Sequence, residues 1–145
     1  AKKYIDQYFE RHQGVKRFIE LTLKSVREKG YATTLLGRKR PVLELKSDNS
    51  VTRQQGERLA INTPVQGSAA DIIKLAMINI WRVFKERNLN TIMILQVHDE
   101  LLFEVPINEL QIVKDLVKEK MERVIELLVP LKVEIGYGKS WADAH

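Results

Sequence analysis

Apolar residues recur along this chain with two periods. Spacings of three and four residues indicate amphipathic helices, whereas strict alternation indicates strands. The pattern predicts helices over residues 2–12, 15–29, about 52–62, 67–87 and 108–128. It predicts strands over 92–97, 101–105 and 131–135, and an irregular hairpin over 31–45 with a basic tip at Arg38–Arg40. The predicted fold class is therefore α+β, a small antiparallel sheet with helices packed on one face.

Particular residues mark the expected ends of the helices. Gly30 is suited to a left-handed cap, and Gln13–Gly14 interrupts the first helical pattern. A further break is expected at Asn62–Pro64, because proline removes a backbone donor. Asn108 is predicted to cap the last helix, with Gln111 completing a capping box.

The segment "IMILQVHDELLFEV", residues 92–105, consists of two apolar runs separated by three polar residues. So short a spacer predicts a tight hairpin with His98 and Asp99 as its loop residues. An unbroken ladder would place one mostly apolar set on the face toward the helices, namely Ile92, Ile94, Gln96, Leu101, Phe103 and Val105.

The hairpin turn also carries candidate chemistry. A carboxylate held on a stiff turn, such as Asp99, suits a hard cation such as Mg²⁺, which takes one or two carboxylates with phosphate oxygens and water. Glu100 lies beside it, and two acids this close repel unless a cation or a proton lies between them. Taken alone, the three residues fit an ordinary surface turn better than a metal site.

Composition and charge narrow the function classes. Hydrophobic residues make up 44% of the 145 residues, and there is no cysteine, which excludes disulfides and thiolate chemistry. No apolar run reaches the roughly 18 residues of a membrane span, so no membrane association is expected. Residues 1–60 carry 14 Lys/Arg and 7 Asp/Glu, whereas residues 61–145 carry 10 and 12. A basic first half indicates a polyanionic partner such as nucleic acid, although it also fits a solvated surface.

Longer stretches resemble one protein family. "LQVHDELLFEVP", residues 95–106, resembles motif C of the family A DNA polymerases, the group typified by bacterial DNA polymerase I. "ERLAINTPVQGSAADIIKLAMI", "YIDQYFERHQGV", "TLLGRKR" and "VPLKVEIGYGKSW" resemble other family segments in the same order. One small departure is Gln13, where the family usually has proline. The family's first catalytic aspartate, in motif A, and its nucleotide-gripping fingers helix lie upstream of anything present here.

The resemblance implies a subdomain assignment and roles for particular residues. Residues 1–57 would form the C-terminal part of the fingers, and residues 58–145 the C-terminal part of the palm. Asp99 would be one of two metal-binding aspartates, with Glu100 an auxiliary acid and His98 a contact to the primer terminus. The residues that would hold the primer-template are Arg53, Arg58, Asn62 and Gln66.

The implied function is template-directed nucleotidyl transfer to a primer 3′-hydroxyl, with two Mg²⁺ ions as cofactors. The expected partners are primer-template DNA, deoxynucleoside triphosphates and the N-terminal part of a longer polymerase, which would supply the second aspartate. The expected location is the cytoplasm, at the nucleoid. Two alternatives stay open: the isolated chain binds duplex DNA without catalysis, or the same carboxylates serve a metal-dependent phosphohydrolase.

Overall fold

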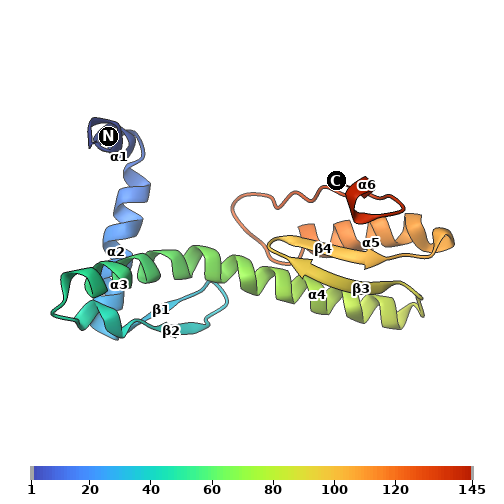
Figure 1. The fold of residues 1–145 in the computed structure, drawn as a ribbon, viewed down its shortest axis with the longest axis horizontal. Coiled ribbons are helices and arrows are strands. Elements are labelled where there is room, and N and C mark those ends of the chain that lie inside the picture. Colours follow the sequence, from blue (N-terminus) through green and yellow to red (C-terminus); the bar gives the residue numbers. More distant parts are fainter. Residues whose placement is uncertain (1, 145) are drawn as a thin grey trace. The chain divides into compact units, whose positions relative to one another are not determined.

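The computed structural model describes residues 2–144 and combines helices with two separate two-stranded antiparallel sheets (Figure 1). This confirms the predicted α+β class. The chain divides into two compact units, one ending at Ser68 and the other beginning at Ala69. Within the described range, every helix is too short or too polar to traverse a bilayer. The assignment of residues 1–57 to fingers and 58–145 to palm stays a prediction.

The first unit is mostly helical and contains a small hairpin. Its elements are α1 (Lys2–Arg11), α2 (Gln13–Lys29), β1 (Tyr31–Thr33), β2 (Lys39–Pro41), the 3-10 helix η1 (Leu43–Lys46), α3 (Ser50–Asn62) and the π-helix η2 (Thr63–Gly67). Gly30 ends α2 at φ 79°, in the left-handed conformation predicted for it. The core of this unit consists of Val26, Ala32, Val42, Leu45 and Ala60.

Several boundaries in the first unit differ from the prediction. The first two helices separate at His12, and Gln13–Gly14 opens α2 instead of interrupting the pattern. The alternating segment after Pro41 forms η1, because Leu45 is buried against α3 and not in a sheet. The turn between β1 and β2 lies at Leu35–Leu36, so Lys39 and Arg40 belong to β2 and not to the hairpin tip.

The second unit packs a hairpin against two helices. Its elements are α4 (beginning with the last residue of the first unit, Ser68–Glu86), β3 (Ile92–Val97), β4 (Glu100–Glu104), the 3-10 helix η3 (Ile107–Glu109), α5 (Leu110–Glu122) and α6 (Trp141–Ala144). The core joins Ile80, Val83 and Phe84 of α4 to Val113, Leu116 and Val117 of α5. One face of the hairpin covers this core through Met93, Leu101, Phe103 and Val105.

The hairpin register agrees with the prediction near the turn and departs from it further away. Val97 pairs with Glu100 and Leu95 with Leu102, as expected for a two-residue loop. A bulge between Met93 and Leu95 then shifts the register by one residue. Because side chains alternate in a strand, Met93 turns to the core while Ile94 is 54% exposed. The prediction that Ile92 and Ile94 face the helices is therefore wrong.

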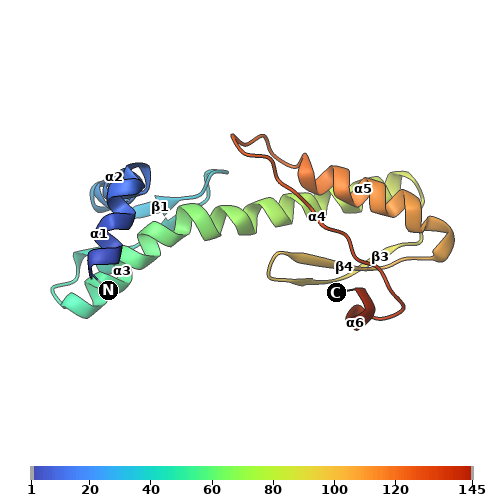
Figure 2. The same cartoon turned by 90° about the horizontal axis from the view of Figure 1, so that it is seen from above.

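The region after α5 also differs from the prediction. The last long helix ends at Glu122 and not at 128, and no strand forms over 131–135 (Figure 2). The residues over 131–135 still alternate between half-buried and exposed. Their backbone is held differently, because the Val133 N–H donates to the Glu122 carboxylate at 3.1 Å. The predicted capping box is absent as well: no side chain caps α5, and Gln111 donates to Asp115 instead.

Candidate functional site

The turn of the β3–β4 hairpin is a constrained platform. His98 has φ 52°, in the left-handed region that non-glycine residues rarely adopt. Two-residue hairpin turns require such a φ at their first loop position, so the tightness of the turn dictates this conformation. The Gln96 side-chain amide donates to the His98 carbonyl at 2.5 Å, which braces the turn from its own strand. A strained and braced turn holds its side chains in a defined place.

Two neighbouring carboxylates lie on this platform, Asp99 in the turn and Glu100 at the start of β4. Both are exposed, as is His98. Their oxygens are ligands of the kind that Mg²⁺ prefers, and the ion accepts one or two carboxylates beside water and phosphate oxygens. Among residues 2–144, no three acidic or histidine side chains gather closely enough to hold a metal ion. Asp99 and Glu100 could supply at most part of the ligands of such an ion.

Side-chain packing fixes the β3–β4 hairpin against α4 within the second unit. The Phe103 ring meets Phe84 of α4 edge to face, with centroids 5.9 Å apart. Such aromatic pairs stabilise the fold by about 1 kcal/mol beyond the contribution of their buried surface. Because Phe103 lies on β4 four residues from Asp99, this contact anchors the strand that leaves the turn.

A buried carboxylate anchors the other strand at its start. Glu109 is only 7% exposed. Its two oxygens accept hydrogen bonds from the backbone N–H groups of Asn90 and Thr91, at 2.9 and 3.0 Å. They also accept from the Asn90 amide at 3.3 Å and the Thr91 hydroxyl at 2.7 Å. Since Thr91 directly precedes β3, Glu109 fixes where that strand begins.

The same hydrogen bonds determine the acidity of Glu109. The Asn90 backbone N–H, followed by the Thr91 hydroxyl, lowers the pKa of this carboxyl below its usual value, and burial opposes them only in part. Sequence reasoning missed this residue. No local pattern could have indicated it, because glutamate is rarely buried and its partners lie 18 and 19 positions away.

A second group of candidate residues lies on the first unit, along α3 and η2. Arg58, Asn62 and Gln66 are all exposed. In an α-helix, each four-residue step overshoots a full turn by about 40°, so Gln66 would be displaced by about 80° from Arg58. The π turn is wider, closing its hydrogen bonds over five residues, so the step from Asn62 to Gln66 falls short of a full turn. The two deviations oppose each other, and the π turn returns Gln66 toward the side of Arg58.

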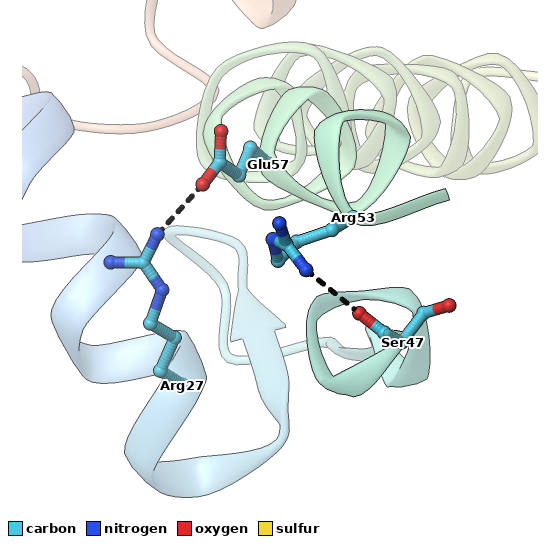
Figure 3. Close-up of polar contacts among 4 residues, drawn as sticks. All are labelled: Arg27, Ser47, Arg53 and Glu57. Carbon is cyan, nitrogen blue, oxygen red and sulfur yellow. Dashed lines mark hydrogen bonds and ion pairs between the residues drawn. The ribbon is translucent and has the colours of Figure 1, made fainter. Parts of the chain in front are cut away.

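Arg53, the fourth predicted DNA contact, is exposed near the start of α3. One of its guanidinium nitrogens donates to the Ser47 carbonyl at 3.1 Å (Figure 3). A guanidinium has five N–H donors, so this bond braces the side chain and leaves others for a phosphate. Nearby, Arg27 of α2 pairs with Glu57 of α3 at 2.7 Å (Figure 3).

Two side chains of the basic cluster Arg38–Arg40 make contacts within the first unit. An Arg38 nitrogen donates to the Gly67 carbonyl at 3.1 Å, and the Lys39 ammonium lies 4.8 Å from the centre of the Tyr31 ring. The Arg38 side chain therefore braces the first unit internally.

The sequence matches the family model of DNA polymerase family A over residues 1–143. The chain belongs to this family. Its curated relatives include DNA polymerase I of Bacillus subtilis, 50% identical over 99% of this chain and 16% of the relative. DNA polymerase I of Caldicellulosiruptor bescii is 49% identical over 99% of this chain and 17% of the relative. The chain thus spans about one sixth of the length of these family A relatives.

A solved family A structure is similar throughout. It is described as the POL domain of Pol1 from M. smegmatis in complex with DNA primer-template and dNTP. The TM-score is 0.96 at 47% identity, and the match covers 99% of this chain and 25% of that one. The structure brings His98, Asp99 and Glu100 together on one turn and places Arg58, Asn62 and Gln66 along one helical path. Their roles in this family A chain remain predictions.

Proposed function

We propose that this chain is the part of a family A DNA polymerase that carries one catalytic carboxylate and a duplex-holding helix. The reaction would join the primer 3′-oxygen to the α-phosphorus of a deoxynucleoside triphosphate. The bond between the α-phosphorus and the bridging oxygen of pyrophosphate would break, pyrophosphate would leave, and the 3′-hydroxyl proton would pass to water. The family match over residues 1–143 and the complex of the similar POL domain with primer-template and dNTP support this reaction class. We infer that the polymerase acts at the nucleoid, in the cytoplasm.

Asp99 carries the catalytic part of the proposal. Its carboxylate would ligate magnesium from a turn that the two paired strands hold in place. Glu100 would act as an auxiliary acid beside it. Two magnesium ions, when bound, would activate the attacking hydroxyl and neutralise charge on the phosphates. One aspartate cannot hold two ions, so the remainder of the polymerase would contribute its motif A aspartate. His98 would contact the primer terminus from the same turn.

The α3–η2 path carries the DNA-binding part of the proposal. Arg58, Asn62 and Gln66 would donate hydrogen bonds to the minor groove, where purine N3 and pyrimidine O2 offer acceptors at similar places. Such contacts hold duplexes of any sequence, as a polymerase requires. Arg53 would contact a phosphate nearby. Their exposure and their roughly common side on the helix support this interpretation.

The single observation that carries the proposal is a pair of exposed carboxylates on a braced turn within a motif C match. The test is Asp99→Asn in the polymerase that contains this segment, assayed for single-nucleotide incorporation and for primer-template affinity. We expect incorporation to fall on the order of a hundredfold or more, since metal-assisted charge stabilisation supplies several kcal/mol. Duplex affinity should change by less than about twofold, because one exposed carboxylate makes little contact with the duplex.

A matched control separates the metal role from a general effect of lost charge. Asp115 is an exposed aspartate on α5 that accepts from Gln111 of the same helix. Asp115→Asn should leave incorporation unchanged. Normal incorporation by Asp99→Asn would remove the proposed role of that residue. Primer extension by the isolated 145-residue chain tests the alternative that this chain alone binds duplex DNA without catalysis. We expect the isolated chain to bind duplex DNA and to extend no primer.

A further inference from the structure

Three buried polar residues meet where the β1–β2 loop touches the π turn. Thr34 of the loop, Thr63 of η2 and Ser68 just after η2 are 5%, 4% and 3% exposed. Buried hydroxyls are costly unless they are hydrogen-bonded. The hydrogen bonds of these hydroxyl groups therefore indicate which parts of the backbone are held together here.

Ser68 repairs the hydrogen bonding that the π turn disrupts. In an α-helix its backbone N–H would donate to the Pro64 carbonyl, but here that N–H donates to the Val65 carbonyl. The Ser68 hydroxyl donates to the Pro64 carbonyl in its place. The same oxygen accepts from the Leu35 N–H at 2.8 Å. One hydroxyl thus satisfies a carbonyl of the π turn and ties the β1–β2 loop to it.

One further hydrogen bond holds the loop against the π turn, and a second one fixes the shape of the loop itself. Arg38 donates to the Gly67 carbonyl at 3.1 Å, and its backbone N–H donates to the Thr34 hydroxyl at 3.1 Å. A side chain at residue 67 would force the loop and the π turn apart at this point. A Cβ there would lie 2.8 Å from the Thr34 methyl carbon, below normal van der Waals distance.

We propose that Ser68 and Gly67 are positioning residues for Gln66. The clamp that they form with the β1–β2 loop keeps Thr63–Gly67 in the π conformation, and this conformation returns Gln66 to the side of Arg58. The inference rests on the proposed duplex contact by Gln66. It adds a role for two residues that need not touch DNA, and it assigns the π turn a purpose.

The test is a double-mutant cycle on primer-template affinity in the polymerase that contains this segment. Gln66→Ala should weaken binding about fivefold, the value of one hydrogen bond. Ser68→Ala should weaken it by a similar factor, because the π turn loses its clamp. The double variant should bind no more than about twofold worse than Gln66→Ala alone, since both changes remove the same contact. Ser68→Ala combined with Arg58→Ala should instead multiply the two losses, because Arg58 precedes the π turn.

Two restoring variants distinguish positioning from a general loss of structure. Ser68→Thr keeps the hydroxyl and should restore affinity. Gly67→Ala should reproduce the loss without removing any hydroxyl. Adding Thr34→Ser to it should recover binding, because serine lacks the obstructing methyl and keeps the oxygen that accepts from Arg38. This second pair also tests the proposal if Ser68→Ala fails to fold.

The outcomes separate the two levels of the argument. If Gln66→Ala binds normally, Gln66 is not a duplex contact, and the positioning role is overturned with it. If Gln66→Ala weakens binding but Ser68→Ala has no effect or multiplies with it, the contact stands and the positioning role is overturned. Non-additive losses, with recovery in Ser68→Thr and in Gly67→Ala/Thr34→Ser, support the proposal.

Discussion

The replacement Gly56→Ala sets two opposing effects against each other inside the helix that carries the predicted DNA contacts. Gly56 lies in the interior of α3 and is buried. Helix propensity alone predicts that alanine stabilises this position by about 1 kcal/mol. The structure predicts the opposite, because the new Cβ would lie 2.8 Å from the Leu45 nitrogen and 2.9 and 3.0 Å from two Glu44 carbons.

The steric term should win at this position. Two of the three close atoms are backbone atoms of η1, so the clash cannot be relieved by rotating a side chain. Overpacking of this kind costs about 1–3 kcal/mol, and the upper part of that range applies when backbone must move. After subtracting about 1 kcal/mol of propensity gain, we expect a net destabilisation of about 1–2 kcal/mol.

Amide hydrogen exchange in the intact polymerase would measure this effect locally. Exchange of α3 amides and of the Ser47 N–H, which donates to the Glu44 carbonyl, should become roughly 5–30 times faster. Gly14→Ala is the matched control, since Gly14 lies in the first turn of α2 and a Cβ added there would meet no packed neighbour within 4 Å. There alanine should slow exchange slightly or leave it unchanged. Slower exchange of α3 in Gly56→Ala would refute the steric argument.

Two further changes test the anchors of the site. Glu109→Gln should speed exchange of the Thr91 amide at neutral pH, because the glutamine NH₂ would face a donor where a carboxylate oxygen now accepts. The folded pKa of Glu109 is lowered, so its stabilising effect is present above the ordinary value of 4.5 and is lost as pH falls below it. In that acid range, exchange of the Thr91 amide should therefore become faster in the wild type, and the change with pH should be smaller in Glu109→Gln. Glu104→Gln replaces an exposed carboxylate and should follow the wild type. Asn49→Ala should cost about 1 kcal/mol at the start of α3, because the Asn49 side chain accepts from the Val51 N–H at 2.9 Å. Asn49→Asp should preserve the cap, and unchanged Val51 exchange in Asn49→Ala would argue against it.

The comparison of sequence with structure shows which information is local. The positions of α1 to α5, the left-handed cap at Gly30 and the two-residue turn at His98–Asp99 follow from short-range periodicity and backbone sterics, and the sequence predicts them. The segment 131–135 illustrates the limit. Its alternation correctly predicted alternating burial, but a strand also needs a neighbouring strand, and the Val133 N–H is bonded to Glu122 instead.

The bulge in β3 illustrates a second limit. Within Ile92–Val97 the residues Met93, Ile94 and Leu95 are all apolar, so nothing in their order indicates which one faces the core. The choice was made by packing against α4 and α5, and it put Met93 inward. Likewise, the sequence gives no local signal for the bonds that Glu109 accepts from Thr91 or that Ser68 accepts from Leu35, because these partners are distant along the chain.

The sequence by itself determined the family, the helical segments and the placement of two acids on a tight turn, because these depend on residues close together along the chain. The tertiary structure decided the strand register, the buried clamp of Glu109 and the π turn that orients Gln66. Those features depend on which distant groups compete for the same hydrogen bonds and the same space, and that competition is settled only when the chain has folded.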